Sequence, residues 1–389
     1  MDWRQRVTNL SRGGSLMVAT GALLVATYSI FMVLKEGRIS NLYNHQSTSC
    51  QFPAIYNFGD SNSDTGAVSA VFEHLLPPYG MTYFHKPSGR YSDGRLIIDF
   101  IAEKLGLPYL SAYVDSIGSN FRHGANFAAS GATIQAADAL MLNKNFNPLT
   151  LDVQLSQFER FKRRSSDLYL QEKSTEIKDR LPRSEDYTRA LYTFDIGQND
   201  LHAGVTSMKE EHVKKYIPTI INELSSAVEK LYQGGARTFW IHNTGPIGCL
   251  PLLLKNYPPA PENVDEIGCV ISYNRVAQEF NKQLKDKISK LGTQLQGSSL
   301  VYVDIYSVKY SLISEASKHG FTDPLGKCLW KDGDALKACA NPLEYISWDG
   351  IHHTEAANKW VADHIQDGFV SEPKIPLTEF CWPVSGSGR

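Results

Sequence analysis

Short apolar runs that end at a turn residue recur along the chain after residue 50. Continuous runs of this kind, bounded by turn signals, are typical of strands buried on both faces of a parallel sheet. Four runs fit this pattern well, and a fifth, at 125–129, fits it more weakly. The stronger four cover residues 52–58, 190–196, 238–241 and 300–305.

Helical periodicity fills the gaps between these runs. Apolar residues recur every three or four positions, which gives each segment one apolar stripe. The predicted helices cover residues 96–105, 153–161, 213–232 and 270–291. Strands that alternate with amphipathic helices predict an α/β fold, with a parallel sheet between two layers of helices. In such open sheets, ligands bind beyond the carboxyl ends of the strands.

The N-terminus carries an uncharged run at residues 13–34. A helix of this length rises about 33 Å, enough to cross a hydrocarbon core of about 30 Å. Arg4, Arg6 and Arg12 precede the run, whereas Lys35 and Arg38 follow it. This small excess of basic residues before the run favours a cytoplasmic N-terminus.

Three interpretations of this run compete. The favoured one is an uncleaved type II anchor at 13–34, after a cytoplasmic tail at 1–12 and before a stem at 35–50 and a lumenal domain at 51–389. The second is a signal peptide cut near Ser29, which would release a secreted protein. The run is longer than a signal core of about 7–15 residues and ends in bulky side chains, a poor cleavage site. The third is a buried helix of the soluble domain.

Six cysteines all follow the apolar run, and no CxxC motif occurs. Spacings of this kind suit loop-closing disulfides in the secretory pathway better than zinc ligands. Because six cysteines allow fifteen pairings, one pattern is only a preference over the others, and buried free thiols are the alternative. The preferred pairs are Cys249–Cys269, Cys328–Cys339 and Cys50–Cys381.

Composition excludes several classes of protein. The 389 residues are 42% hydrophobic and 21% charged, which is ordinary for a globular protein and unlike a disordered or collagen-like chain. The net charge of −2 lacks the basic excess of a nucleic-acid-binding protein, so no nucleic-acid partner is expected. The basic stretch at 160–164 is interpreted as the solvated face of a helix.

Candidate catalytic residues follow the predicted strands or lie near the C-terminus. Ser61 comes just after the first strand, in Gly59-Asp60-Ser61. Asp349 and His352 are three positions apart, so the carboxylate can accept the Nδ1–H of the ring and leave Nε2 facing a nucleophile. Either motif alone is ambiguous, since Gly-Asp-Ser is more often a plain turn. His353 is the alternative base.

Two further motifs supply hydrogen-bond donors beyond strand ends. Gly131 lies in the segment 124–133, which follows the weaker strand, and offers a backbone N–H. Asn199 lies in Gly-Gln-Asn-Asp at 197–200 and offers a side-chain amide. Donors at such places can stabilise the oxyanion of an acyl-transfer reaction.

With these motifs in this order, the chain resembles the plant GDSL esterase/lipases, a branch of the SGNH hydrolase superfamily. The resemblance covers residues 52–383. One small departure is Asn62, which stands where the family name has Leu, at a position that varies between members. The motifs are FGDSNSDTG (58–66), GANFAASGAT (124–133), GQND (197–200) and DGIH (349–352).

This resemblance implies a flavodoxin-like fold, with a five-stranded parallel sheet sandwiched between helices, and a serine esterase that needs no metal or organic cofactor. Ser61 would be the nucleophile, Asp349 the acid partner and His352 the base. The oxyanion hole would consist of the Ser61 and Gly131 N–H groups and the Asn199 side chain.

The substrate remains an expectation. The predicted anchor resembles that of the membrane-anchored members that remove O-acetyl groups from polysaccharides, so we expect an acetylated cell-wall glycan such as xylan, in the Golgi. A secreted esterase or lipase acting on small acyl esters or lipids is the alternative. Acyl transfer to a sugar and a catalytically silent carbohydrate-binding protein also stay open.

Overall fold

A computed structural model describes residues 50–72, 74–115, 117–136 and 147–381. The predicted tail, the predicted anchor and almost all of the predicted stem therefore lie outside the described residues. Within those ranges, none of the helices combines the length and the apolar character needed to span a bilayer.

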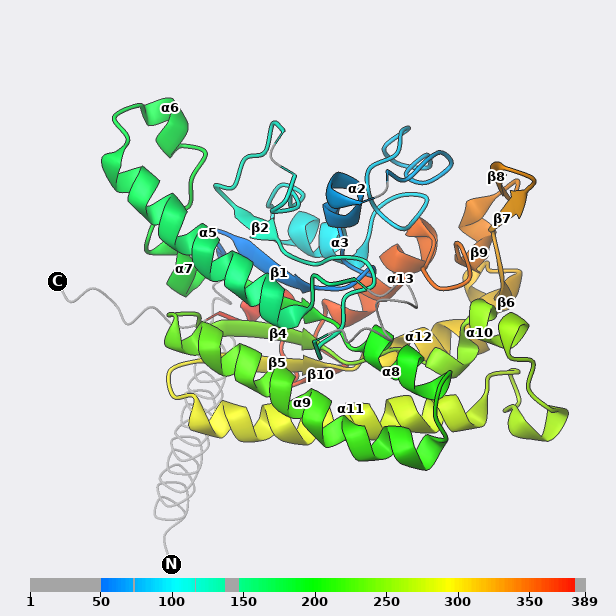
Figure 1. Cartoon of the computed structure of the whole chain (residues 1–389). Coiled ribbons are helices and arrows are strands. Elements are labelled where there is room, and N and C mark those ends of the chain that lie inside the picture. Colours follow the sequence, from blue (N-terminus) through cyan, green and yellow to red (C-terminus); the bar gives the residue numbers. More distant parts are fainter. Residues whose placement is uncertain (1–49, 73, 116, 137–146, 382–389) are drawn as a thin grey trace, which may run out of the picture. The chain divides into compact units, whose positions relative to one another are not determined.

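The centre of the fold is a six-stranded sheet in the order β10-β5-β4-β3-β1-β2 (Figure 1). Five strands are parallel and coincide with the five predicted runs, whereas β10 pairs with β5 in the antiparallel direction. The sheet thus confirms the predicted α/β class. The bounds are β1 Ile55–Gly59, β2 Gly124–Asn126, β3 Leu191–Asp195, β4 Thr238–His242, β5 Ser299–Val303 and β10 Ser371–Glu372.

Alternate residues of the strands point into two apolar layers, one on each face of the sheet. Tyr56 and Phe58 of β1 pack into the layer built with α5, α9 and α11. Ile55 of the same strand packs into the layer built with α3, α12 and α13. All four predicted helices are confirmed, as α3, α5, α9 and α11, and the structure adds α12 and α13. The bounds are α3 Ile97–Lys104, α5 Leu151–Gln171, α9 Glu210–Gln233, α11 Ile271–Gln294, α12 Ile305–Ser314 and α13 Glu355–Ile365.

Shorter elements extend the connections between the main ones. Between α12 and α13 the chain forms two small sheets, one from β6 and β9 and one from the hairpin β7–β8. The strands are β6 Asp323–Lys327, β7 Leu329–Asp332, β8 Ala335–Ala338 and β9 Tyr345–Ser347. The short helices are α2 Ala67–Val71, α6 Thr175–Lys178, α7 Asp186–Arg189, α8 Gln198–Val205 and α10 Pro251–Asn256.

Three disulfides match the preferred pairing. Cys50 joins Cys381, which links the first and last described residues of the domain. The second bond closes the segment 249–269, and the third closes the hairpin β7–β8 at its base. The basic stretch at 160–164 lies within α5, where its three arginines are exposed and Phe161 is buried, as expected for a solvated helix face.

Candidate active site

The serine turn begins where β1 ends. Gly59 is the last residue of the strand, and a Cβ there would lie 2.3 Å from Ser63 Oγ and 2.7 Å from the Asp195 carbonyl oxygen. Only glycine therefore allows the turn to pass this close to β3. The side-chain amide of Gln154 binds the N–H and the carbonyl of Gly59, at 3.0 and 2.9 Å. Ser61 follows within this turn and is buried.

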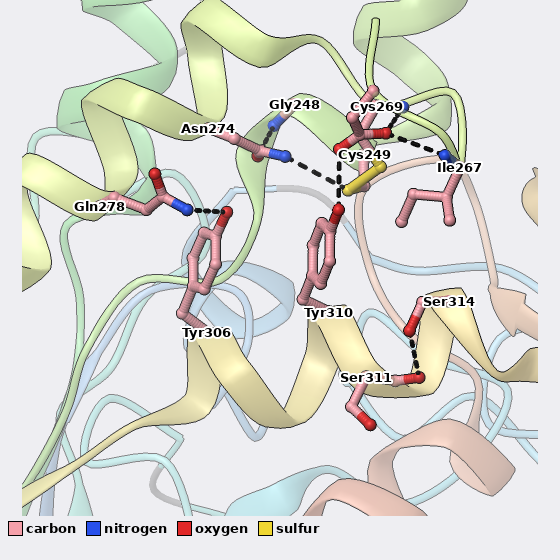
Figure 2. The surroundings of a disulfide bond; sticks show 11 residues. Gly248, Cys249, Ile267, Cys269, Asn274, Gln278, Tyr306, Tyr310, Ser311 and Ser314 are labelled. Atoms are coloured by element: carbon pink, nitrogen blue, oxygen red, sulfur yellow. Dashed lines mark hydrogen bonds between the residues drawn. A yellow bond between two sulfur atoms is a disulfide. The ribbon is translucent and has the colours of Figure 1, made fainter.

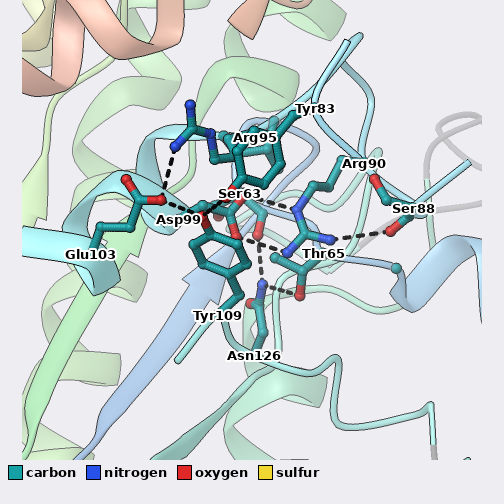
Figure 3. A network of polar contacts seen from close by, with 12 residues as sticks. Ser63, Thr65, Tyr83, Ser88, Arg90, Arg95, Asp99, Glu103, Tyr109 and Asn126 are labelled. Carbon is teal, nitrogen blue, oxygen red and sulfur yellow. Dashed lines mark hydrogen bonds and ion pairs between the residues drawn. The ribbon is translucent and has the colours of Figure 1, made fainter. Parts of the chain in front are cut away.

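Buried amides hold the next residues of the turn. Asn126, at the end of β2, donates from Nδ2 to the Ser63 carbonyl at 2.6 Å and to Thr65 Oγ1 at 2.9 Å (Figure 3). Asn57 of β1 donates to Asn126 Oδ1 at 2.7 Å and accepts from Thr193 Oγ1 of β3 at 2.7 Å. Three adjacent strands thus fix the segment that follows Ser61.

Asp64 connects the serine turn to the second motif. Its carboxylate accepts hydrogen bonds from the N–H groups of Gly66, Ala67 and Val68, and also from Ser130 at 2.8 Å. Ser130 directly precedes Gly131, which has a left-handed φ of 78°. The position of this backbone donor therefore depends on Asp64.

Asn199 lies in the first turn of α8 and is oriented by its own hydrogen bond. Its Nδ2 donates to the Ala132 carbonyl at 2.8 Å, one residue beyond Gly131. The neighbouring Asp200 accepts from the N–H groups of Ile134 and Gln135. Burial raises the pKa of Asp200 to about 7, although these two hydrogen bonds act in the opposite direction. Hydrogen bonds from Asn199 and Asp200 thus hold the GQND segment against the segment that follows Gly131.

Asp349 and His352 form a hydrogen-bonded pair in the turn between β9 and α13. His352 Nδ1 lies 2.6 Å from Asp349 Oδ2, and Asp349 Oδ1 accepts from the N–H groups of Ile351 and His352. Because an ionised carboxylate only accepts, Nδ1 carries the proton and Nε2 is left as the acceptor. Asp349 pairs with His352 and not with His353.

The Asp349 carboxylate is held in its ionised form. Burial alone would raise its pKa, but the charge and hydrogen bonds of His352, together with the backbone donors, outweigh burial and lower the pKa below its usual value. Tyr79 adds a fourth donor, with its hydroxyl 3.2 Å from Asp349 Oδ2. An ionised carboxylate here is suited to stabilising a positive charge on the His352 ring.

One cavity brings these segments together at the carboxyl end of the strands. Ser61 and Asn199 line it from one side, and Ile351 and His353 line it from the Asp349–His352 turn. The lining, as far as it is described, does not include Gly131 or His352, and no described hydrogen bond joins Ser61 to His352. Catalytic hydrogen bonds often tighten only when substrate binds. The catalytic roles of these residues therefore stay a prediction.

The Cys249–Cys269 disulfide supports one wall of the cavity. Residues 245–251 form this wall, and the disulfide fastens it to the start of α11 (Figure 2). Asn274 of α11 accepts from the Gly248 N–H at 2.9 Å. Asp265 accepts from the Cys269 N–H and from the Tyr310 hydroxyl of α12, both at 2.9 Å. The wall is thus joined to two helices.

Residues without a recognisable sequence signal also support the site. The Tyr91 ring lies 5.1 Å from the His352 ring, centre to centre. Arg95 pairs with Glu355, the first residue of α13, at 2.5 Å. It also pairs with Glu103 at 2.8 Å, as Figure 3 shows. Arg95 thus holds the start of α13, the helix that follows the Asp349–His352 turn. Tyr79 gave no signal, because its contact with Asp349 spans 270 residues.

Comparison with known proteins identifies the family of the chain. The family model described as GDSL-like Lipase/Acylhydrolase matches residues 55–365. The chain belongs to the GDSL lipase/acylhydrolase family. It is 49% identical over 351 residues to a GDSL esterase/lipase of Arabidopsis thaliana, with 86% of this chain and 90% of the relative covered. An esterase of Hevea brasiliensis is 48% identical over 359 residues, which cover 87% of this chain and 91% of the relative.

These relatives show that this GDSL protein is a carboxylic-ester hydrolase, and they leave its substrate open. A third relative, named alpha-L-fucosidase 3 of Arabidopsis thaliana, is 45% identical over 341 residues, with 82% of this chain and 91% of the relative covered. Names that differ this much at similar identity show that family membership does not define the natural substrate. Within the described part of the chain, no group of three or more His, Cys, Asp or Glu side chains could hold a metal ion.

Proposed function

We propose that the chain hydrolyses esters with Ser61 as the nucleophile, His352 as the general base and Asp349 as its acid partner. The observation that carries this proposal is the Asp349–His352 pair, which leaves Nε2 as an acceptor in a turn whose Ile351 and His353 line the same cavity as Ser61. The Ser61 and Gly131 N–H groups and the Asn199 amide would form the oxyanion hole. Family membership supports the reaction class.

The steps follow from this geometry. His352 Nε2 takes the hydroxyl proton as Ser61 Oγ attacks the ester carbonyl carbon, and the tetrahedral oxyanion accepts hydrogen bonds from the three donors. His352 then gives its proton to the leaving alcohol, which produces an acyl-enzyme. Water repeats the sequence and releases the acid. Asp349 keeps the ring in the required tautomer and stabilises its charged form.

For the natural substrate we propose an O-acetylated cell-wall polysaccharide such as xylan, with the catalytic domain in the Golgi lumen. The uncharged run at 13–34 and the resemblance to membrane-anchored polysaccharide O-acetyl esterases support this choice. Three disulfides are consistent with an oxidising compartment. Incubation of the full chain with acetylated xylan should release acetate, and an absence of release would contradict this substrate.

A second candidate is a secreted esterase or lipase that acts on small acyl esters or lipids. Part of the cavity supports it, because Ile247, Leu250 and Ile313 give the wall near Ser61 an apolar surface that suits an acyl chain. Esters of one alcohol with acyl chains from C2 to C16 separate the two candidates. An optimum at C2 supports the deacetylase, whereas an optimum at C8 or longer supports the lipase.

The central test is Ser61→Ala. We expect this variant to lose ester hydrolysis and to melt within a few degrees of the wild type, because only one hydroxyl is removed. Ser156→Ala, at an exposed serine of α5, is the matched control and should keep full activity. Hydrolysis of p-nitrophenyl acetate by Ser61→Ala at the wild-type rate would contradict the assignment.

A further inference from the structure

The cavity that contains Ser61 is also lined by a buried lysine, which has no role in the proposed steps of ester hydrolysis. Lys309 of α12 lines this cavity although the residue is only 4% exposed. It lies against Gly245, where an added Cβ would be 3.0 Å from Lys309 Cδ and 3.8 Å from Nζ. No carboxylate of the described residues pairs with Nζ within 4 Å. A buried ammonium without a close anion is costly, so its surroundings need an explanation.

Burial lowers the pKa of Lys309, and the charges of Asp195 and then Asp60 oppose this shift from a distance, although both carboxylates have other partners or surroundings. Asp195 Oδ2 lies 3.3 Å from His242 Nδ1, and Trp240 Nε1 donates to His242 Nε2 at 3.1 Å. Because the indole can only donate, His242 accepts at Nε2 and donates from Nδ1 to Asp195. The charge of Asp195 is thus shared between Lys309 and a hydrogen-bond donor.

Asp60 offers still less charge to Lys309. One of its oxygens accepts two hydrogen bonds from Asn62, whereas Oδ2 is buried without a partner among the described residues. Burial, and then the neighbouring Asp195, raise the pKa of Asp60 well above its usual value, so this carboxyl holds a proton more readily. Neither carboxylate therefore makes a direct hydrogen bond or ion pair with Lys309 Nζ.

His353 supplies a second unused polar group in the same cavity. Both of its ring nitrogens are buried and lack a hydrogen-bond partner in the described part of the chain. Burial, and then the charge of Lys309, lower its pKa, so the ring is neutral and offers one N–H donor and one acceptor. Buried polar groups without partners are rare, and in a cavity they mark a place where a ligand can bind.

We infer that this cavity binds a carboxylate carried by the ester substrate, with Lys309 Nζ and the His353 N–H as the donors. This inference rests on the proposed function and names the class of ester that the site prefers. Two donors suit the two oxygens of one carboxylate, and the ammonium is the charged donor of the pair. The doubly charged form of a phosphate would leave an extra negative charge near Asp60 and Asp195, which disfavours it.

Two sources could supply the carboxylate, and two pairs of substrates distinguish them. The acyl chain could carry it, as in a dicarboxylic monoester; the test compares 4-methylumbelliferyl hemisuccinate with 4-methylumbelliferyl pentanoate. The sugar could carry it instead; the test compares an O-acetylated methyl glucuronide with the corresponding O-acetylated methyl glucoside. In one of the pairs, we expect the wild-type kcat/KM to favour the charged ester by about tenfold or more. No preference for the charged ester in either pair would overturn the inference.

Substitution of Lys309 tests whether this side chain causes the preference for the charged ester. Lys309→Met keeps the length of the side chain and removes its charge, so the ratio of the two kcat/KM values should fall about tenfold toward one. Lys285→Met, at an exposed lysine of α11 that pairs with Glu372, is the matched control and should leave the ratio unchanged. An unchanged ratio in Lys309→Met, with both esters slowed equally, would show that Lys309 only balances Asp60 and Asp195 and would overturn the inference.

His353→Phe gives a second test that does not remove the buried charge. It replaces one ring by another and deletes the proposed N–H donor, so the charged ester should lose rate relative to the neutral one by a few fold. An equal effect on both esters would contradict a role in carboxylate binding. The two proposals can fail separately. If the wild type hydrolyses both esters of each pair at equal kcat/KM, the carboxylate inference fails while Ser61 remains the proposed nucleophile, whereas activity in Ser61→Ala contradicts the proposed function itself.

Discussion

The two halves of the candidate site are held in different ways. The serine half is part of the sheet: Gly59 pairs with Asp195 of β3, and buried amides from β1 and β2 fix the residues after Ser61. The acid–base half lies in the turn after β9, at the end of the long excursion that follows α12. Side chains from distant segments hold it, among them Tyr79 and, through the start of α13, Arg95.

Because of this difference, substitutions in the two halves test different properties of the protein. Buried amides and a close glycine leave the serine half little room to adjust, so changes to its framework will affect folding as well as rate. The acid–base half makes single hydrogen bonds that can be removed one at a time. Variants of the second half therefore measure chemistry more cleanly, and those of the first half need a parallel measurement of stability.

The largest effect is expected for Asp349→Asn in the acid–base half. An amide in this place can donate to Nδ1, which would favour the wrong tautomer of His352, so kcat should fall about 10⁴-fold. Steady-state kinetics on p-nitrophenyl acetate measures this loss. Asp363→Asn, at an exposed residue of α13 paired with Lys359, is the control. A loss below tenfold would remove Asp349 from the proposed triad.

Asn199→Ala should give the next largest effect, on the serine half. Loss of one oxyanion donor typically lowers kcat about 10²–10³-fold. The hydrogen bond to the Ala132 carbonyl is lost as well, so the melting temperature must be measured in parallel. If kcat is unchanged in a variant that still folds, Asn199 is not an oxyanion donor.

A smaller effect is expected for Tyr79→Phe. The variant removes one of the four hydrogen bonds to Asp349 and keeps the ring packed against Tyr91 and Trp348. One hydrogen bond contributes about 0.5–1.5 kcal/mol, so kcat should fall about two- to tenfold. Tyr216→Phe, at an exposed tyrosine of α9, should have no effect. If the two variants behave alike, Tyr79 does not support the pair.

Asp200 gives the smallest predicted effect, on the pH dependence of stability. Its pKa is raised to about 7 in the folded protein, so between about pH 4 and pH 7 the folded state binds the proton more tightly than the unfolded state. The stability from this group is full below about pH 4 and is lost as the pH rises toward 7. Relative to Asp200→Asn, the wild type should therefore be more stable at pH 5 than at pH 8. Denaturant titrations at both pH values measure the difference; the opposite trend would contradict a raised pKa.

Sequence patterns predicted the five parallel strands, the helices α3, α5, α9 and α11 and the preferred disulfides, because each depends on local composition or on spacing. The helices α12 and α13 were not predicted. Nor did the patterns predict β10, whose two residues are too few to show a periodic pattern. They also gave no role to Lys309, since a lysine in a helix is usually exposed and only the packing of α12 under the Ser61 cavity buries it. The sequence left His353 open as an alternative base. In the structure Asp349 pairs with His352, and His353 lines the cavity.

Covalent labelling of the full chain tests the central claim most directly. A fluorophosphonate reacts with a serine only when a base activates its hydroxyl, so mass spectrometry of the labelled and digested protein identifies the nucleophile. We predict a single major adduct on the peptide that contains Ser61, and no adduct on this peptide in His352→Ala. An adduct on another residue of the active enzyme, or equal labelling of Ser61 without His352, would contradict this account.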